Sequence, residues 1–144
     1  MREKTLNLLG LMRRANALQL GETNAGAAVR GGKAKLLLLA SDASDNARGR
    51  AEGFLFGRNA IGLTLPFTKA EISAHVGVSG CSMAAVTDIG FANALMKLLV
   101  ALSPGEYEEA AAQVEQRFSR AERRKKEAKA HEKNKRTGKR RTNI

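Results

Sequence analysis

The order of apolar and polar positions along the chain predicts alternating helices and strands. Residues 5–17 place apolar side chains three and four apart, which is typical of an amphipathic helix. Residues 18–20 alternate as a short strand does, and the Ala-rich stretch 22–30 ends in two glycines, a common helix terminus. Residues 35–40 are apolar at both even and odd positions, which favours a central strand covered on both faces, with a buried helix as the alternative.

The second half of the chain continues this alternation. Thr68 and Glu71 have the spacing of a capping box, which opens a helix by pairing side chains with free backbone N–H groups. In order, we expect a polar turn at 41–44, a helix to residue 58, a strand at 61–65, a short helix to residue 76, a glycine loop at 77–80, a strand at 83–87 and a helix at 91–102.

A break at residues 103–105, Ser-Pro-Gly, divides the chain. Beyond it, Tyr107, Val114 and Phe118 belong to an apolar stripe over 107–121, which predicts a helix that folds back on the domain or docks on a partner. We expect an α/β domain at 1–102, a three-layer α/β/α sandwich with a small mixed sheet of about four strands. Residues 103–144 form its C-terminal helical basic extension.

Positive charge is concentrated at one end of the chain. Residues 117–144 carry thirteen Lys and Arg against three Glu, a net +10, whereas residues 1–116 carry twelve against eleven acidic residues, a net +1. Cations that neutralise phosphates release counterions, so this segment would bind a polyanion without reading its sequence. A solvated tail and docking on anionic lipid are the alternatives. The expected nucleic-acid contacts are Arg123, Arg124, Lys125, Lys126, Lys139, Arg140 and Arg141.

The cysteine content and the lengths of the apolar runs indicate the cellular compartment. Cys81 is the only cysteine, which excludes an intramolecular disulfide and a thiolate zinc cluster and suits a reducing cytosol. The N-terminal residues lack the apolar core of a signal peptide, and the longest apolar run, 36–40, is too short to span a bilayer. We expect a cytoplasmic protein without a metal, a cofactor or a membrane partner.

No motif indicates catalysis. The Gly-Lys pair at 32–33 suggests a phosphate-binding loop, but Ala27 and Ala34 stand where that pattern needs Gly and Ser or Thr. His75 and Cys81 are close in sequence, yet nothing in their spacing implies a nucleophile–base pair. We therefore expect a protein that is not an enzyme.

Two segments carry residue types that contact nucleic acid. Residues 21–24 lie at a predicted helix start, where free N–H groups attract phosphates or groove edges. Thr23 and Asn24 suit base edges, with ordinary helix capping as the alternative. The loop at 77–82 has small apolar residues that would cover an extruded base. Its alternative is a plain connection in which Val78 or Cys81 enters the core.

Four segments, taken in their order along the chain, match the sequence pattern of a known protein family. They are Leu8-Leu9-Gly10-Leu11-Met12-Arg13-Arg14-Ala15, the helix opening Leu20-Gly21, Gly31-Gly32-Lys33-Ala34-Lys35-Leu36-Leu37-Leu38-Leu39-Ala40-Ser41-Asp42-Ala43-Ser44, and Val86-Thr87-Asp88-Ile89-Gly90-Phe91-Ala92. On these segments the chain from Leu6 to Leu99 resembles the L-seven-Ae/L-thirty-e ribosomal-protein family, and within it the small bacterial YlxQ-type members. The Gly-Lys-Ala-Lys motif before the strand is the most specific part.

The resemblance implies an α/β/α sandwich that binds structured RNA, typically a kink-turn. In such proteins the start of the second helix enters the groove at tandem sheared G·A pairs, and the loop before the last strand covers a bulged base. The corresponding residues here are Gly21, Glu22, Thr23 and Asn24, with Lys33 at the following turn, and the loop from Val78 to Met83 with Cys81 and Ser82.

These observations lead to one expected function and two alternatives. We expect a ribosome-associated RNA-binding protein, part of a ribonucleoprotein, that recognises a kink-turn or similarly bent RNA such as an rRNA element. The first alternative is a protein-interaction scaffold that docks through the 107–121 stripe, with non-specific RNA contact by the tail. The second is a recognition domain that serves a separate RNA-modifying enzyme.

Overall fold

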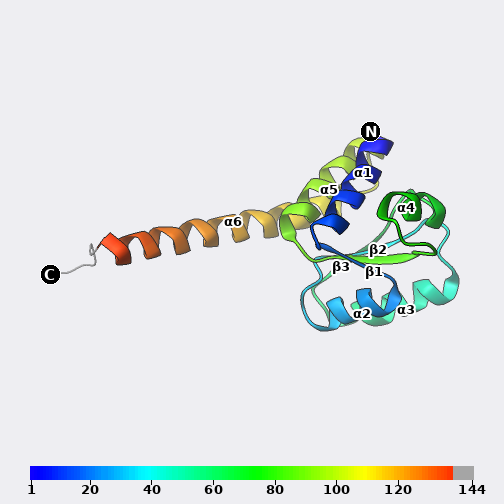
Figure 1. The fold of residues 1–144 in the computed structure, drawn as a ribbon, viewed down its shortest axis with the longest axis horizontal. Helices are drawn as coiled ribbons and strands as arrows, with labels where there is room; N and C mark the ends of the chain where they lie inside the picture. Colours follow the sequence, from blue (N-terminus) through cyan, green and yellow to red (C-terminus); the bar gives the residue numbers. More distant parts are fainter. Residues whose placement is uncertain (138–144) are drawn as a thin grey trace.

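The computed structural model describes residues 1–137, whose elements follow the predicted alternation (Figure 1). The four strands form one mixed sheet in the order β1-β4-β2-β3, in which β2 and β3 are parallel and β4 is antiparallel to both β1 and β2. The predicted α/β class and four-stranded mixed sheet are therefore confirmed. The elements are α1 (Arg2–Arg14), β1 (Leu18–Leu20), α2 (Glu22–Arg30), β2 (Leu36–Leu39), α3 (Asp45–Leu55), β3 (Ile61–Thr64), α4 (Lys69–Val76), β4 (Met83–Val86), α5 (Ile89–Leu102) and α6 (Glu108–Thr137).

Helices cover the two faces of the sheet as separate layers. Side chains alternate across a strand, so Leu36 and Leu38 of β2 pack with α1, α4, α5 and the first turns of α6, whereas Leu37 packs with α2 and α3. Figure 1 shows α2 and α3 below the sheet and the other helices above it. The apolar run at 35–40 thus contains a central strand, and the alternative of a buried helix there is wrong.

Helix starts are stabilised by the capping residues that the sequence predicts. Ser44 accepts a hydrogen bond from the Ala47 N–H at 3.1 Å and caps α3. The capping box of α4 is complete, because Thr68 accepts from the Glu71 N–H and Glu71 accepts from the Thr68 N–H. A hydrogen bond from Arg2 and the Thr68 N–H lower the pKa of Glu71, so this carboxylate stays charged and keeps the cap.

Two helices end earlier than their apolar patterns predict. The helix expected over 5–17 ends at Arg14, since Asn16 adopts a left-handed φ of 60° and turns the chain into β1. The helix expected to reach residue 58 ends at Leu55, and Gly57 follows with a φ of 70°. In both places a residue with positive φ follows the last helical turn, so the helix ends although the apolar pattern continues for a few more residues.

The first turns of α6 belong to the hydrophobic core. Tyr107 and Val114 are 4% and 1% exposed and lie in the same cluster as Leu95 and Leu99 of α5. The Tyr107 hydroxyl donates to the Thr64 carbonyl at 2.7 Å, and burial raises the pKa of this tyrosine. The 107–121 stripe therefore folds back on the domain, the first of its two expected placements, and α6 then continues away from the sandwich (Figure 1).

Candidate nucleic-acid interface

The sheet holds the start of α2 beside the end of the 77–82 loop. β1 pairs with β4 so that Leu20 lies opposite Ala84. The next residue, Gly21, donates its N–H to the Met83 carbonyl at 2.9 Å. Its φ of 89° is a conformation that favours glycine, and it lets the chain pass directly from β1 into α2. Two segments far apart in the sequence thus meet at one end of the sheet.

Backbone N–H groups are free at the start of α2. Gly21 is the N-cap and offers no side chain, so the alternative in which Thr23 or Asn24 caps the helix is wrong. The first bond of the helix runs from the Ala25 N–H to the Gly21 carbonyl at 2.9 Å. The N–H groups of residues 22–24 donate no hydrogen bond within residues 1–137. Such groups, together with the helix dipole, attract anions.

The side chains of this first turn differ in how they are held. Glu22 is paired with Arg50 of α3, whose Nη1 lies 2.8 Å from each carboxylate oxygen, so its charge is neutralised towards α3. Asn24 donates from Nδ2 to the Leu20 carbonyl at 2.9 Å, which fixes the amide. Thr23 is exposed. Thr23 and Asn24 therefore present short polar groups to solvent.

A polar groove of about 490 Å³ connects Asn24 with Lys33 along one side of α2. Ala27 and Ala28 of α2 and Gly31, the residue after the helix, are among the lining residues, and their small size leaves room for a ligand to approach the helix. Gln19 and Thr87 line it as well and were missed by the sequence analysis. The alternation of β1 could have indicated Gln19, because it is the polar residue between two leucines.

Two side chains of the 77–82 loop, Val78 and Cys81, face inward. Cys81 is 3% exposed, and Met83, which follows the loop, is 1% exposed; Val78 packs against the core, and Ser82 is half-buried. Burial raises the pKa of the Cys81 thiol, which makes it a poor nucleophile. The alternative in which Cys81 enters the core is therefore confirmed. Residues 79–80 form the exposed tip of this loop.

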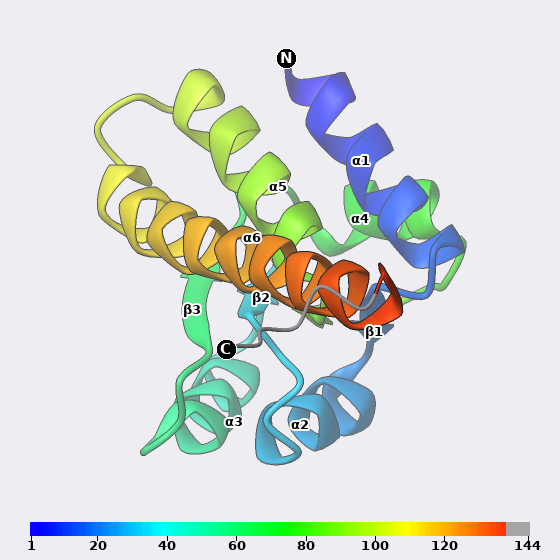
Figure 2. The same ribbon diagram turned by 90° about the vertical axis from the view of Figure 1, so that its left-hand side faces the viewer.

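The basic residues of α6 lie mainly beyond the part that packs on α5. Arg123, Arg124, Lys125 and Lys126 are exposed. Lys125 lies 4.0 Å from a carboxylate oxygen of Glu122, an exposed pair that contributes little stability. Lys139, Arg140 and Arg141 lie outside the described residues. In Figure 2, which looks from the side toward which α6 projects, this helix lies in front of the sandwich, with α5 above it and α2 and α3 below it in the view.

Residues 1–137 contain neither a metal-binding cluster nor a membrane-spanning helix. No cluster of three or more His, Cys, Asp or Glu side chains in this range could hold a metal ion. None of the helices in the described part of the chain has an apolar stretch long enough to cross a bilayer.

Comparison with known proteins shows the fold. No family model and no curated protein sequence matches the chain. A protein of unknown function from Bacillus halodurans superposes with a TM-score of 0.61 and 27% sequence identity, over 67% of this chain and 96% of that one. The 15.5kD RNA binding protein of Giardia lamblia superposes with a TM-score of 0.53 and 20% identity, over 65% of this chain and 80% of that one.

Proposed function

We propose that this protein is a cytoplasmic, non-enzymatic RNA-binding protein that recognises a kink-turn or similarly bent RNA, within a ribosome or another ribonucleoprotein. The main support for this proposal is the hydrogen bond from the Gly21 N–H to the Met83 carbonyl, which holds the free N–H groups of α2 beside the end of the 77–82 loop. The fold shared with the 15.5kD RNA binding protein supports the same ligand class. The resemblance of residues 6–99 to the L-seven-Ae/L-thirty-e family supports the kink-turn.

Each part of this surface has a role in the proposal. The N–H groups of residues 22–24 and the side chains of Thr23 and Asn24 contact base edges and phosphates at the bend. Lys33 contacts a phosphate at the far end of the Asn24 groove. The tip of the 77–82 loop lies over the unstacked base. Buried Cys81 and Met83 act from below, by holding the loop in place rather than by touching RNA.

The proposal is tested by comparing a kink-turn RNA with a straight duplex of matched length at increasing salt. We expect the kink-turn RNA to bind more tightly, and Asn24→Ala to weaken that binding by about 5- to 150-fold, which corresponds to about 1–3 kcal/mol for a lost base contact. Duplex binding should not change. Equal affinity for the two RNAs at every salt concentration would contradict the proposal.

Asn46→Ala is the matched control. Asn46 is also an exposed asparagine in the first turn of a helix, α3. Its replacement should leave both affinities unchanged. Thermal unfolding of Asn24→Ala separates a lost RNA contact from loosening of the helix start, since Asn24 also bonds to the Leu20 carbonyl.

A further inference from the structure

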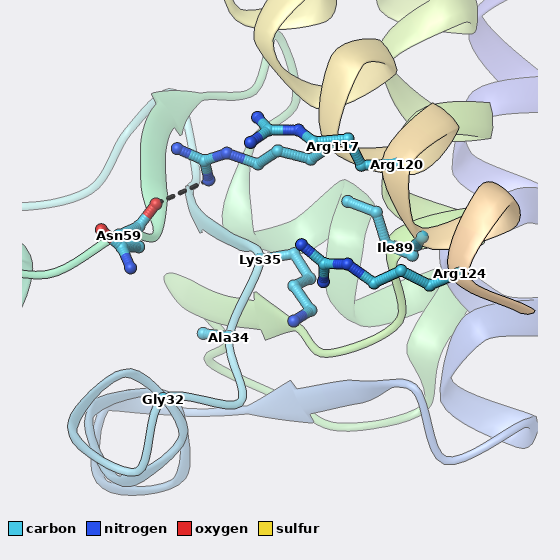
Figure 3. Close-up of a pocket in the computed structure, with 9 residues that line it drawn as sticks. Gly32, Ala34, Lys35, Asn59, Ile89, Arg117, Arg120 and Arg124 are labelled. Atoms are coloured by element: carbon cyan, nitrogen blue, oxygen red, sulfur yellow. Dashed lines mark hydrogen bonds between the residues drawn. The ribbon is translucent and has the colours of Figure 1, made fainter. Parts of the chain in front are cut away.

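A second groove, of about 460 Å³, lies between α6 and the residues that precede β2 (Figure 3). Four of its nine lining residues are cations and none is acidic. Lys35 belongs to the wall before β2, and Arg117, Arg120 and Arg124 belong to the wall formed by α6. Figure 3 shows Lys35 and Arg124 pointing into the same space. We call this the α6 groove.

The α6 groove lies at the opposite end of the sheet from Gly21. Gly21 bonds to Met83, the first residue of β4, whereas Lys35 donates its N–H to Val86, the last residue of β4, at 2.7 Å. α2 runs between these two ends, and its nine residues extend over about 13 Å. The α6 groove is thus at the far end of the sheet from the start of α2, and it adjoins the Asn24 groove only at residues 31–35, where Lys33 lines one groove and Lys35 the other.

The α6 groove is held open by the fold. Arg117 donates from Nη1 to the Asn59 carbonyl at 2.7 Å and fixes α6 against the connection between α3 and β3 (Figure 3). Arg120 and Arg124 follow at spacings of three and four residues, which places them on the same side of the helix as Arg117. Within the described part of the chain, Arg120 and Arg124 make no hydrogen bond or ion pair, so both guanidinium groups are available.

The lining chemistry indicates the ligand. Four cations without an acidic partner repel one another and suit a polyanion, and guanidinium groups match phosphate oxygens in geometry. No aromatic side chain lines the groove, so it offers bases no stacking surface. An acidic peptide would need apolar anchors, and Ile89 is the only large apolar side chain among the lining residues. Consecutive phosphates of a nucleic-acid strand therefore fit best.

We propose that the α6 groove is a second RNA-contact site that holds the phosphodiester backbone of a strand between Lys35 and the arginines of α6. The proposal rests on the proposed function for its ligand class and adds a site at the other end of the sheet. RNA would then contact the domain at two ends, with recognition of the bend at one end and sequence-independent attachment at the other.

The test uses the full chain and an unstructured uridine homo-oligonucleotide, whose binding is measured by fluorescence anisotropy at several salt concentrations. The variant Arg120→Gln/Arg124→Gln removes two charges from the α6 groove. The matched control, Lys126→Gln/Lys129→Gln, removes two exposed charges from the opposite side of α6. All four positions are exposed, so both proteins should fold, as checked by thermal unfolding.

We expect the groove pair to weaken binding about tenfold more than the control pair. Its slope of log affinity against log salt should become shallower by about 0.7 for each lost phosphate contact. Lys35→Gln should weaken binding in the same way from the other wall. Equal losses for the two pairs would show that net charge alone matters and would overturn the proposal, as would full binding by Lys35→Gln.

Competition distinguishes a phosphate-backbone site from a general acidic one. Polyglutamate of matched charge should displace the oligonucleotide less well than unlabelled RNA does. Equal displacement would point to an acidic peptide and overturn the proposal. The uridine probe contains no kink-turn, so a negative result here is independent of the Asn24 experiment, and loss of kink-turn preference in that experiment leaves this one intact.

Discussion

Single residues decide how closely the helices approach one another. A Cβ at Gly10 of α1 would lie 2.7 Å from the backbone carbonyl oxygen of His75 at the end of α4, closer than atoms in contact can be. A Cβ at Gly49, on the exposed side of α3, would meet nothing within 4 Å. The same substitution at these two glycines should therefore have opposite effects.

Gly10→Ala should lower the free energy of unfolding by about 1–3 kcal/mol, because α1 and α4 must move apart to admit a methyl group against backbone. Gly49→Ala should raise it by about 0.4–1 kcal/mol, because alanine restricts the unfolded chain at a helical position that it fits. Urea unfolding with an unchanged m-value measures both. A neutral Gly10→Ala would contradict the close approach of α1 and α4.

At the scale of the element, α6 performs two functions along one helix. Its first turns place Val114 in the core and Phe118 beside Gly90 of α5, next to Tyr107, which directly precedes the helix, while the later turns are exposed and basic. The alternative in which the 107–121 stripe docks on a partner therefore has no exposed stripe to use. The same helix that completes the core also forms one wall of the α6 groove.

Val114→Ala should lower the free energy of unfolding by about 1.5–3 kcal/mol, since it removes a side chain that is 1% exposed. The neighbouring Glu115→Ala, on the exposed side of α6, should change it by less than about 0.5 kcal/mol. Chemical denaturation of the two variants gives the comparison. If both are as stable as the parent, α6 does not pack on α5, and docking on a partner becomes the better explanation of the stripe.

Across the whole molecule, the proposed function places RNA selectivity in the sandwich and general electrostatic attraction in the basic extension. The sandwich is nearly neutral up to residue 116, and the excess charge lies in the extension. A charged extension raises affinity for every polyanion equally, so preference between RNAs must come from the geometry of the sandwich.

A chain truncated after residue 121 tests this division. It loses eleven Lys and Arg and three Glu, a net charge of +8, but keeps the buried residues of α6. We expect it to fold, to bind all RNAs more weakly with a shallower salt dependence, and to retain the ratio of kink-turn to duplex affinity. Circular dichroism checks the fold. A ratio that falls to one would place recognition in the extension instead.

Local patterns explain why the elements themselves were predictable. The continuous apolar run of β2 and the Thr68–Glu71 capping box involve residues only a few positions apart, so both can be recognised directly in the sequence. The end of α1 at Arg14 could not be predicted in this way, because it depends on the left-handed backbone conformation of Asn16. The spacing of apolar residues contains no information about that conformation.

The candidate site was predictable only in part. As the sequence indicated, residues 21–24 lie at a helix start and the 77–82 loop directly precedes a strand; their contact with RNA stays a prediction. The sequence offered the inward orientation of Cys81 only as an alternative, and it did not indicate that Met83 is buried, because both depend on how the chain packs between α4 and β4. Gly21, rather than Thr23 or Asn24, is the N-cap of α2, and its N–H is bonded to the Met83 carbonyl, a long-range contact that local composition does not reveal.

The sequence by itself determined the order of helices and strands and the concentration of positive charge beyond residue 116. These follow from periodicity and charge, which are short-range properties of the chain. Only the tertiary structure decided which side chains reach the surface and that Lys35 faces Arg124 across a groove. Those facts depend on contacts between residues far apart in the chain, which no local pattern encodes.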